Sequence, residues 1–115
     1  MKITLRRSTV YIPDWNGNKK LKKEDQIKVH YNYLTTEQRN DFIVSGGKLS
    51  VAKVGKEVFL AAVTKIENLT AEIDGEEVEI TKENIFDVPD LHDLYMDVTV
   101  EIISSSSLDS TSKKK

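Results

Sequence analysis

The stretch QIKVHYNYLTTEQR, residues 26–39, decides how this chain folds, because its hydrophobic period changes part-way along. In the first half, apolar and polar residues alternate, which predicts a β-strand with one buried face. Thr35 interrupts the alternation and Gln38 follows it after three residues, a spacing typical of the capping box at a helix N-terminus. The stretch therefore predicts a strand that leads directly into a helix. The side chains expected on the buried face of the strand are Ile27, Val29, Tyr31 and Tyr33.

Before this strand, the chain has the pattern of sheet and turn. Alternating apolar residues predict one strand, or a bent pair of strands, over residues 2–12. The dipeptide Asn16-Gly17 accepts the positive φ angles of a tight turn, and Pro13 cannot donate to a sheet ladder. Residues 19–25 are expected to form a charged connector.

After the strand, helical spacing predicts two helices. The first begins near Thr35, turns Phe42 and Ile43 inward and ends at residues 45–47, which are Ser-Gly-Gly. The second is amphipathic and falls within residues 50–69. Its apolar positions are Val58, Phe59, Ala62, Val63, Ile66 and Leu69.

The rest of the chain predicts a hairpin, a short helical turn and a long final helix. Asp74-Gly75 supports a type I′ turn and closes a hairpin over residues 71–80. Thr81 is placed to cap the short turn, and Asp90, after Pro89, is placed to cap the final helix. The final helix has two apolar stripes, Leu91, Leu94, Tyr95, Val98 and Ile102 in one and Met96, Val100 and Ile103 in the other.

Two properties of this final segment leave alternatives open. Residues 98–103 are rich in β-branched side chains and could form a strand, but the upstream stripe that begins at a capping aspartate favours a helix. An apolar surface on more than one side indicates a helix sandwiched in the core, or one that offers a face to a partner.

These elements predict a small α+β domain in which N-terminal antiparallel strands and a central hairpin pack on three to four helices. A chain of 115 residues is close to the commonest domain size, so we expect one domain. It should span residues 1–103. Residues 104–115 are rich in Ser and Lys and are expected to be a disordered tail.

Composition excludes several classes of site. The chain has no cysteine, which removes disulfides, thiolate metal sites and thiol nucleophiles, and it has only two histidines. No apolar run is long enough for a membrane span, and the N-terminus turns polar too early for a signal peptide. We therefore expect a cytoplasmic protein without a membrane partner.

The charge is divided unevenly along the chain. Residues 1–66 carry 13 Lys and Arg against 6 Asp and Glu, whereas residues 67–101 carry 1 against 12. Such polarity favours steering toward charged partners, or head-to-tail contact between copies of the chain, within the screening length of salt.

The ionisable residues do not form a recognisable catalytic or metal motif. His92 and His30 fall on polar faces, which favours surface histidines over catalytic ones. The acidic series in residues 72–79 lacks the spacing of an EF-hand loop, and the glycines match neither common phosphate-binding motif. We expect no enzymatic activity, no metal and no cofactor.

Nucleic acid is an alternative partner. A lysine cluster lies between Trp15 and the tyrosines of the predicted strand, and cations interleaved with aromatic rings are typical of single-strand binders. The sequence pI of about 5.7 and the acidic second half oppose this interpretation. The cluster is Lys19, Lys20, Lys22 and Lys23.

The order of these elements resembles the small tail assembly chaperones of long-tailed bacteriophages. The stretches that carry the resemblance are KITLRRSTVYIPDWNGN, QIKVHYNYLTTEQR, VTKIENLTAEIDGEEVEIT, LHDLYMDVTVEII and the closing SSSSLDSTSKKK. The resemblance implies a non-enzymatic helper that binds the tape-measure protein, the tail-tube protein or both, in the cytoplasm of the host bacterium.

A chaperone of this kind needs an apolar helical face and a charged exterior. We expect this face both to pack on the core and to bind the partner. Its residues are Leu91, Leu94, Tyr95, Val98, Ile102, Phe59, Val63 and Ile66. The simpler interpretation is that each of them is core only. Two other functions stay open: a small head-tail or tail connector subunit retained in the virion, and a single-stranded nucleic-acid-binding module.

Overall fold

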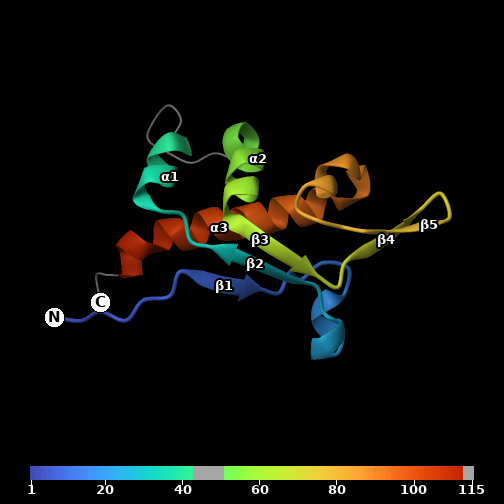
Figure 1. The fold of residues 1–115 in the computed structure, drawn as a ribbon, viewed down its shortest axis with the longest axis horizontal. Coiled ribbons are helices and arrows are strands. Elements are labelled where there is room, and N and C mark those ends of the chain that lie inside the picture. Colours follow the sequence, from blue (N-terminus) through green and yellow to red (C-terminus); the bar gives the residue numbers. More distant parts are fainter. Residues whose placement is uncertain (43–50, 113–115) are drawn as a thin grey trace.

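Figure 1 shows the computed structural model of the chain, which describes residues 1–42 and 51–112. A three-stranded antiparallel sheet in the order β1-β2-β3 lies against a long C-terminal helix, and a separate two-stranded hairpin extends from one end. This is the α+β fold that the sequence predicts. The strands are β1 (Ser8–Tyr11), β2 (Lys28–Asn32), β3 (Val63–Glu67), β4 (Thr70–Ile73) and β5 (Glu76–Glu79). The α-helices are α1 (Thr36–Phe42), α2 (Val51–Ala62) and α3 (His92–Ser112).

Strand β2 is the centre of the main sheet, as its alternation predicts. Val29 and Tyr31 are each 1% exposed, whereas Asn32 faces solvent. The hydroxyl group of Tyr31 lies 3.0 Å from Ser105 Oγ, and the hydroxyl group of Tyr11 donates to Asp97 Oδ1 at 2.9 Å. Both contacts join the sheet to α3, so α3 covers this face of the sheet.

Helix α2 packs beside α3, and an aromatic cluster fills the space between them. The ring of Phe59 meets Phe86 at 5.4 Å and Tyr95 at 5.5 Å between centroids, both edge to face. Phe86 belongs to the first of two short 3₁₀ turns before α3, η3 (Asn84–Asp87) and η4 (Pro89–Leu91). The cluster therefore ties α2, η3 and α3 into one core.

Two hydrogen bonds confirm the predicted start of α1. The N–H of Thr35 donates to Gln38 Oε1 at 3.0 Å, and the N–H of Gln38 donates to Thr35 Oγ1 at 3.1 Å, which is a complete capping box. Phe42 is half-buried against the core. The predicted inward position of Ile43 and the predicted end of the helix at residues 45–47 lie outside the described residues.

The prediction of a single helix over residues 50–69 is wrong in its second half. Helix α2 ends at Ala62, and the chain continues directly as β3, which pairs antiparallel with β2. Val63 and Ile66 fit a helical period by coincidence, but β-branched residues favour a strand when an open edge of a sheet is available. The ammonium group of Lys82 donates to the carbonyl oxygens of Leu60 and Val63 at 3.2 and 3.0 Å and so stabilises the end of the helix.

Both turns predicted from dipeptides are confirmed. Asn16 and Gly17 have φ angles of 50° and 76°, and Asp74 and Gly75 have 53° and 85°. Positive φ at both central residues is the requirement of a type I′ turn. The hairpin of β4 and β5 is closed by the second pair.

Helix α3 confirms the helical interpretation of residues 98–103. Asp90 lies inside η4 and does not cap α3, because the chain already turns at Pro89. The helix continues to Ser112, beyond the predicted domain boundary at residue 103. Serine has only a modest helix penalty, and Ser105 both donates to the carbonyl of Ile102 and contacts Tyr31, so the first turn beyond residue 103 has local and tertiary support.

The N-terminal strand is shorter than predicted. Of residues 2–12, only Ser8–Tyr11 form a strand, and residues 1–6 are extended away from the domain as an arm. The charged connector contains two 3₁₀ turns, η1 (Asn18–Lys20) and η2 (Lys23–Asp25). Within residues 1–42 and 51–112, no helix has both the length and the apolar character needed to cross a membrane.

Candidate protein-binding surfaces

The eight residues predicted to bind a partner lie in or against the hydrophobic core. Six have an exposed fraction of 5% or less, and Tyr95 and Ile66 are half-buried. A partner could contact the six only if the fold opened, so the structure supports the simpler interpretation that they are core. The six are Phe59, Val63, Leu91, Leu94, Val98 and Ile102.

The second stripe of α3 is more accessible. Val100 is 47% exposed, whereas Met96 and Ile103 on either side of it are half-buried. One exposed valine between two half-covered side chains is a small surface, and single exposed apolar residues are normal on proteins.

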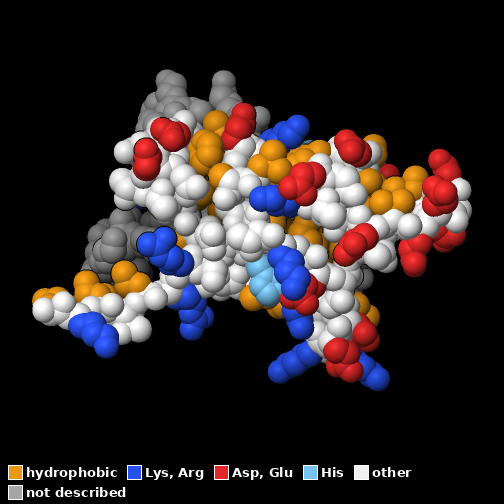
Figure 2. Space-filling model, in the orientation of Figure 1, with side chains coloured by type: hydrophobic (Ala, Val, Ile, Leu, Met, Phe, Trp, Pro, Cys, Tyr) orange, Lys and Arg blue, Asp and Glu red, His pale blue; other side chains and the backbone are white. Residues whose placement is uncertain are grey.

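Among the residues whose burial the structure describes, the largest concentration of exposed apolar side chains is on the N-terminal arm, residues 1–6. Ile3 and Leu5 are 68% and 81% exposed, and Val10 on β1 is 45% exposed. Figure 2 shows hydrophobic atoms along the arm, at the end of the molecule opposite to the hairpin. Backbone pairing reaches only as far as Arg7, whose carbonyl accepts from the N–H of Tyr33 at 2.9 Å. The arm is therefore an extended segment whose apolar side chains are exposed.

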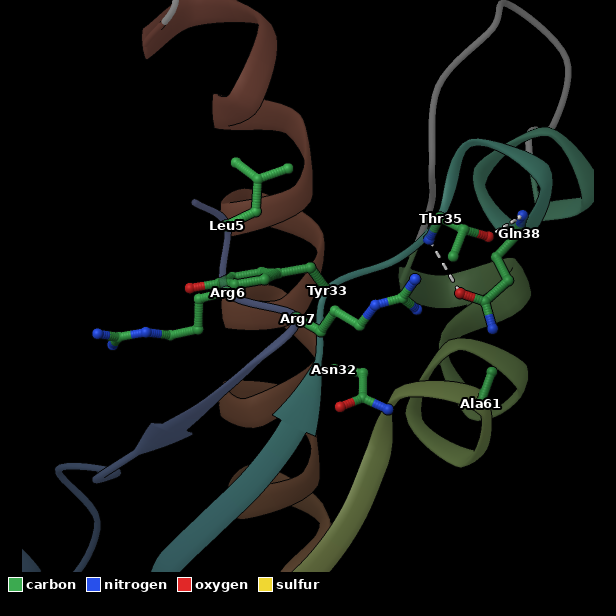
Figure 3. Close-up of a pocket in the computed structure, with 8 residues that line it drawn as sticks. All are labelled: Leu5, Arg6, Arg7, Asn32, Tyr33, Thr35, Gln38 and Ala61. Atoms are coloured by element: carbon green, nitrogen blue, oxygen red, sulfur yellow. Dashed lines mark hydrogen bonds between the residues drawn. The ribbon is translucent and has the colours of Figure 1, made fainter. Parts of the chain in front are cut away.

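Beside the arm lies a groove of about 410 Å³, which we call the arm-side groove. Figure 3 shows that it opens between the arm, the end of β2, the first turn of α1 and the last turn of α2. Its lining mixes apolar and polar groups, two of them guanidinium groups. The lining residues are Leu5, Arg6, Arg7, Asn32, Tyr33, Thr35, Gln38 and Ala61.

The geometry of the arm-side groove suits a peptide or side chain of another protein. Tyr33 is held by an edge-to-face contact with the buried ring of Tyr31 at 5.9 Å, so its position is fixed. The amide group of Gln38 is fixed by the capping box. Arg6 and Arg7 add positive charge at the rim, which favours an acidic neighbour beside the apolar group of a ligand.

The two histidines have structural settings. His30 lies on the polar face of β2, as predicted, and its Nε2–H donates to the carboxylate of Glu67 on β3. This hydrogen bond lowers the pKa of the Glu67 carboxyl below its ordinary value. His92 is exposed at the start of α3 and lies 5.9 Å from the ring of Tyr95.

The acidic residues of the hairpin do not converge on one point. Among residues 1–42 and 51–112, no three His, Asp or Glu side chains are close enough together to hold a metal ion. The hairpin carboxylates spread over one end of the molecule, where Figure 2 shows a group of acidic atoms.

The lysine cluster of the connector is exposed, but the aromatic rings beside it are not free for stacking. Tyr31 is 1% exposed, and Trp15 and Tyr33 are half-buried against the core. Base stacking needs open ring faces, so the arrangement typical of single-strand binders is incomplete here.

No protein-family model, curated protein or solved structure matches this chain.

Sequence reasoning missed the arm-side groove. Its lining comes from four segments that only tertiary folding brings together, and most of its polar residues carry no motif. One signal was present: Ile3 and Leu5 alternate with polar residues as in a strand, although β1 begins only at Ser8.

Proposed function

We propose that this protein is a non-enzymatic assembly chaperone that binds the tape-measure protein, the tail-tube protein or both during bacteriophage tail formation. The observation that carries the proposal is the exposed apolar arm beside the arm-side groove, because unpacked apolar surface on a small domain is typical of a protein-binding site. In this role the protein acts in the cytoplasm of the infected bacterium.

The arm-side groove is the surface proposed to contact the partner. Tyr33 and Ala61 offer an apolar floor on rigid elements, and Arg7 offers a charge for a nearby carboxylate. The tape-measure protein is a long apolar helix that presents side chains at regular spacing. Several copies of this chain would each bind one of these side chains in the arm-side groove, so many weak contacts would together cover the helix.

Co-expression with the tape-measure protein tests the proposal. The expected result is that the tape-measure protein stays soluble and co-purifies with this chain. Ala61→Glu should reduce co-purification about tenfold or more, because it places a carboxylate where an apolar side chain of the partner would be buried. Asn40→Glu, on the exposed face of α1, is the matched control and should bind as the wild type. A tape-measure protein that is equally soluble without this chain would overturn the proposal.

A structural virion subunit is the second candidate, because the hairpin at one end of the molecule is acidic and the arm at the other end is basic, as in subunits that contact one another head to tail. Mass spectrometry of purified virions separates the two functions. A chaperone is absent from the mature particle, whereas a connector subunit is present in stoichiometric amount.

A further inference from the structure

A second groove lies at the hairpin end of the molecule, between β4 and the two 3₁₀ turns that precede α3. It has a volume of about 370 Å³, and we call it the hairpin-side groove. Ala71 and Ile73 of β4 form one apolar wall, and Val88 and Leu91 form the other. Glu72, Asp87 and Asp90 add carboxylates on both sides. The groove thus combines apolar walls with an acidic rim.

The strand on one side of this groove has an open edge. Within the described part of the chain, β4 pairs with β5 alone, so the N–H and C=O groups on its other edge have no strand partner. The groove is lined by β4 and not by β5, which places the open edge of β4 beside it. Such an edge is a template for an added strand.

The hairpin concentrates negative charge that nothing within it offsets. Glu72 of β4 stands directly opposite Glu77 of β5, on the face that also carries Glu79. Like charges directly opposite one another destabilise a strand pair, and an isolated two-stranded hairpin is marginally stable. A basic strand beside β4 would offset this repulsion.

The N-terminal arm has the complementary pattern. In an extended segment alternate side chains point to opposite faces, so Met1, Ile3 and Leu5 share one face while Lys2 and Arg6 share the other. The strand β4 has the same division, with Ile73 on its apolar face and Glu72 on its acidic face.

We propose that the hairpin-side groove binds the N-terminal arm of a second copy of this chain, as a strand added to β4. The apolar side chains of the arm face Ile73 in the groove, and Lys2 and Arg6 lie on the face that carries Glu72. The contact uses the same arm that borders the arm-side groove. It is tested by self-association of this chain alone, so its failure is distinguishable from a failure to bind the tape-measure protein.

The dimensions of the molecule explain why the arm comes from another copy. The arm and the hairpin lie at opposite ends of a chain that is 53 Å long (Figure 1). Six extended residues span about 20 Å, so the arm falls short of the hairpin of its own chain. A contact between two different surfaces joins copies head to tail and gives a ring or a filament.

Sedimentation velocity of the full-length protein over a range of concentrations tests this contact. The wild type should form species larger than a monomer at low salt, and these should dissociate as salt is raised, because the charges involved are exposed. Amide hydrogen exchange gives a second measurement. The amide protons of β4 should become protected at high protein concentration.

Charge-reversal variants make the test specific. Lys2→Glu with Arg6→Glu on the arm, and Glu72→Lys in the groove, should each weaken self-association about 100-fold, because like charges are brought together. Lys20→Glu with Lys23→Glu in the connector, and Glu57→Lys on α2, are exposed controls of equal charge change and should assemble as the wild type.

A mixture of the arm variant and the groove variant should recover the large species, since the acidic arm of one then meets the ammonium group introduced at position 72 of the other. A wild type that stays monomeric at low salt overturns the proposal. So does a mixture that stays dissociated, or a control variant that dissociates as completely as the arm variant.

Discussion

Asn18 shows how one buried amide can order a segment that has little apolar content. It is 2% exposed, and its Nδ2 group donates to the carbonyl oxygens of Pro13 at 2.8 Å and Ile27 at 3.2 Å. Its Oδ1 accepts from the N–H of Ile27 at 2.7 Å. The side chain thus joins the turn after β1 to the start of β2, which neither backbone could do directly.

Replacing Asn18 tests this role. Asn18→Ala removes three hydrogen bonds and leaves buried backbone groups without partners, so the free energy of unfolding should fall by about 3 kcal/mol. Asn40→Ala, on the exposed face of α1, should change it by less than about 0.5 kcal/mol. Urea unfolding of both variants provides the measurement. Equal losses would show that Asn18 is not essential to the loop.

The pair of His30 and Glu67 makes stability depend on pH. The hydrogen bond from His30 lowers the pKa of Glu67 in the folded chain below the ordinary value of 4.5. A carboxyl group of this kind stabilises the fold above its unfolded pKa, and the contribution is lost as pH falls through the lowered folded pKa.

Glu67→Gln should therefore flatten the acid side of the stability profile. Between about pH 5 and pH 3, the urea midpoint of the wild type should fall more steeply than that of the variant. Glu83→Gln, an exposed carboxyl outside this pair, should keep the wild-type slope. Parallel profiles for the wild type and Glu67→Gln would contradict the assigned role of the pair.

At the scale of elements, the sequence predicts a helix, strand or turn correctly wherever residues close together in the chain determine its conformation. The strand β2, the capping box of α1 and both type I′ turns follow from side chains within a few residues of one another. The strand β3 could not be predicted in this way. Its partner β2 lies more than thirty residues earlier, with Lys28 opposite Glu67, and the ammonium group that stabilises the end of α2 comes from Lys82.

The same distinction between local and tertiary information applies to the candidate site. The apolar stripe of α3 was correctly recognised as a stripe, but its period is the same whether a core or a partner covers it. Only the packing of α2 and β2 shows that Leu94 and Val98 are core. Of the described residues, the most exposed large apolar side chains are Met1, Ile3 and Leu5 of the arm.

The capping box predicts a local effect on α1. Thr35→Ala removes the oxygen that accepts from Gln38, which should cost about 1 kcal/mol of helix stability. The N–H of Arg39 donates to the carbonyl of Thr35 at 2.9 Å, so the loss of the cap should make hydrogen exchange at the Arg39 amide about fivefold faster. Thr36→Ala removes the adjacent hydroxyl group and keeps the box, so it should leave this exchange rate close to that of the wild type.

At the scale of the whole molecule, the hairpin and the arm project from opposite ends of a single packed core. The sheet and α2 share one core with α3, with the ring of Phe59 fully buried at its centre. The hairpin extends beyond this core, and its exposed faces carry mainly carboxylates. The arm extends from the other end with exposed apolar side chains. Both projecting ends are thus available for contacts with other chains without disturbing the core.

This division makes Phe59 the residue on which global stability should depend most. Phe59→Ala removes a ring that is 0% exposed and contacts both Phe86 and Tyr95, so the free energy of unfolding should fall by about 3 to 5 kcal/mol. Val100→Ala, at a 47% exposed site on α3, should cost less than about 1 kcal/mol. Urea unfolding followed by circular dichroism measures both. If Phe59→Ala cost no more than Val100→Ala, the aromatic cluster would not join α2 to α3, and the stripe of α3 would again be available as a partner surface.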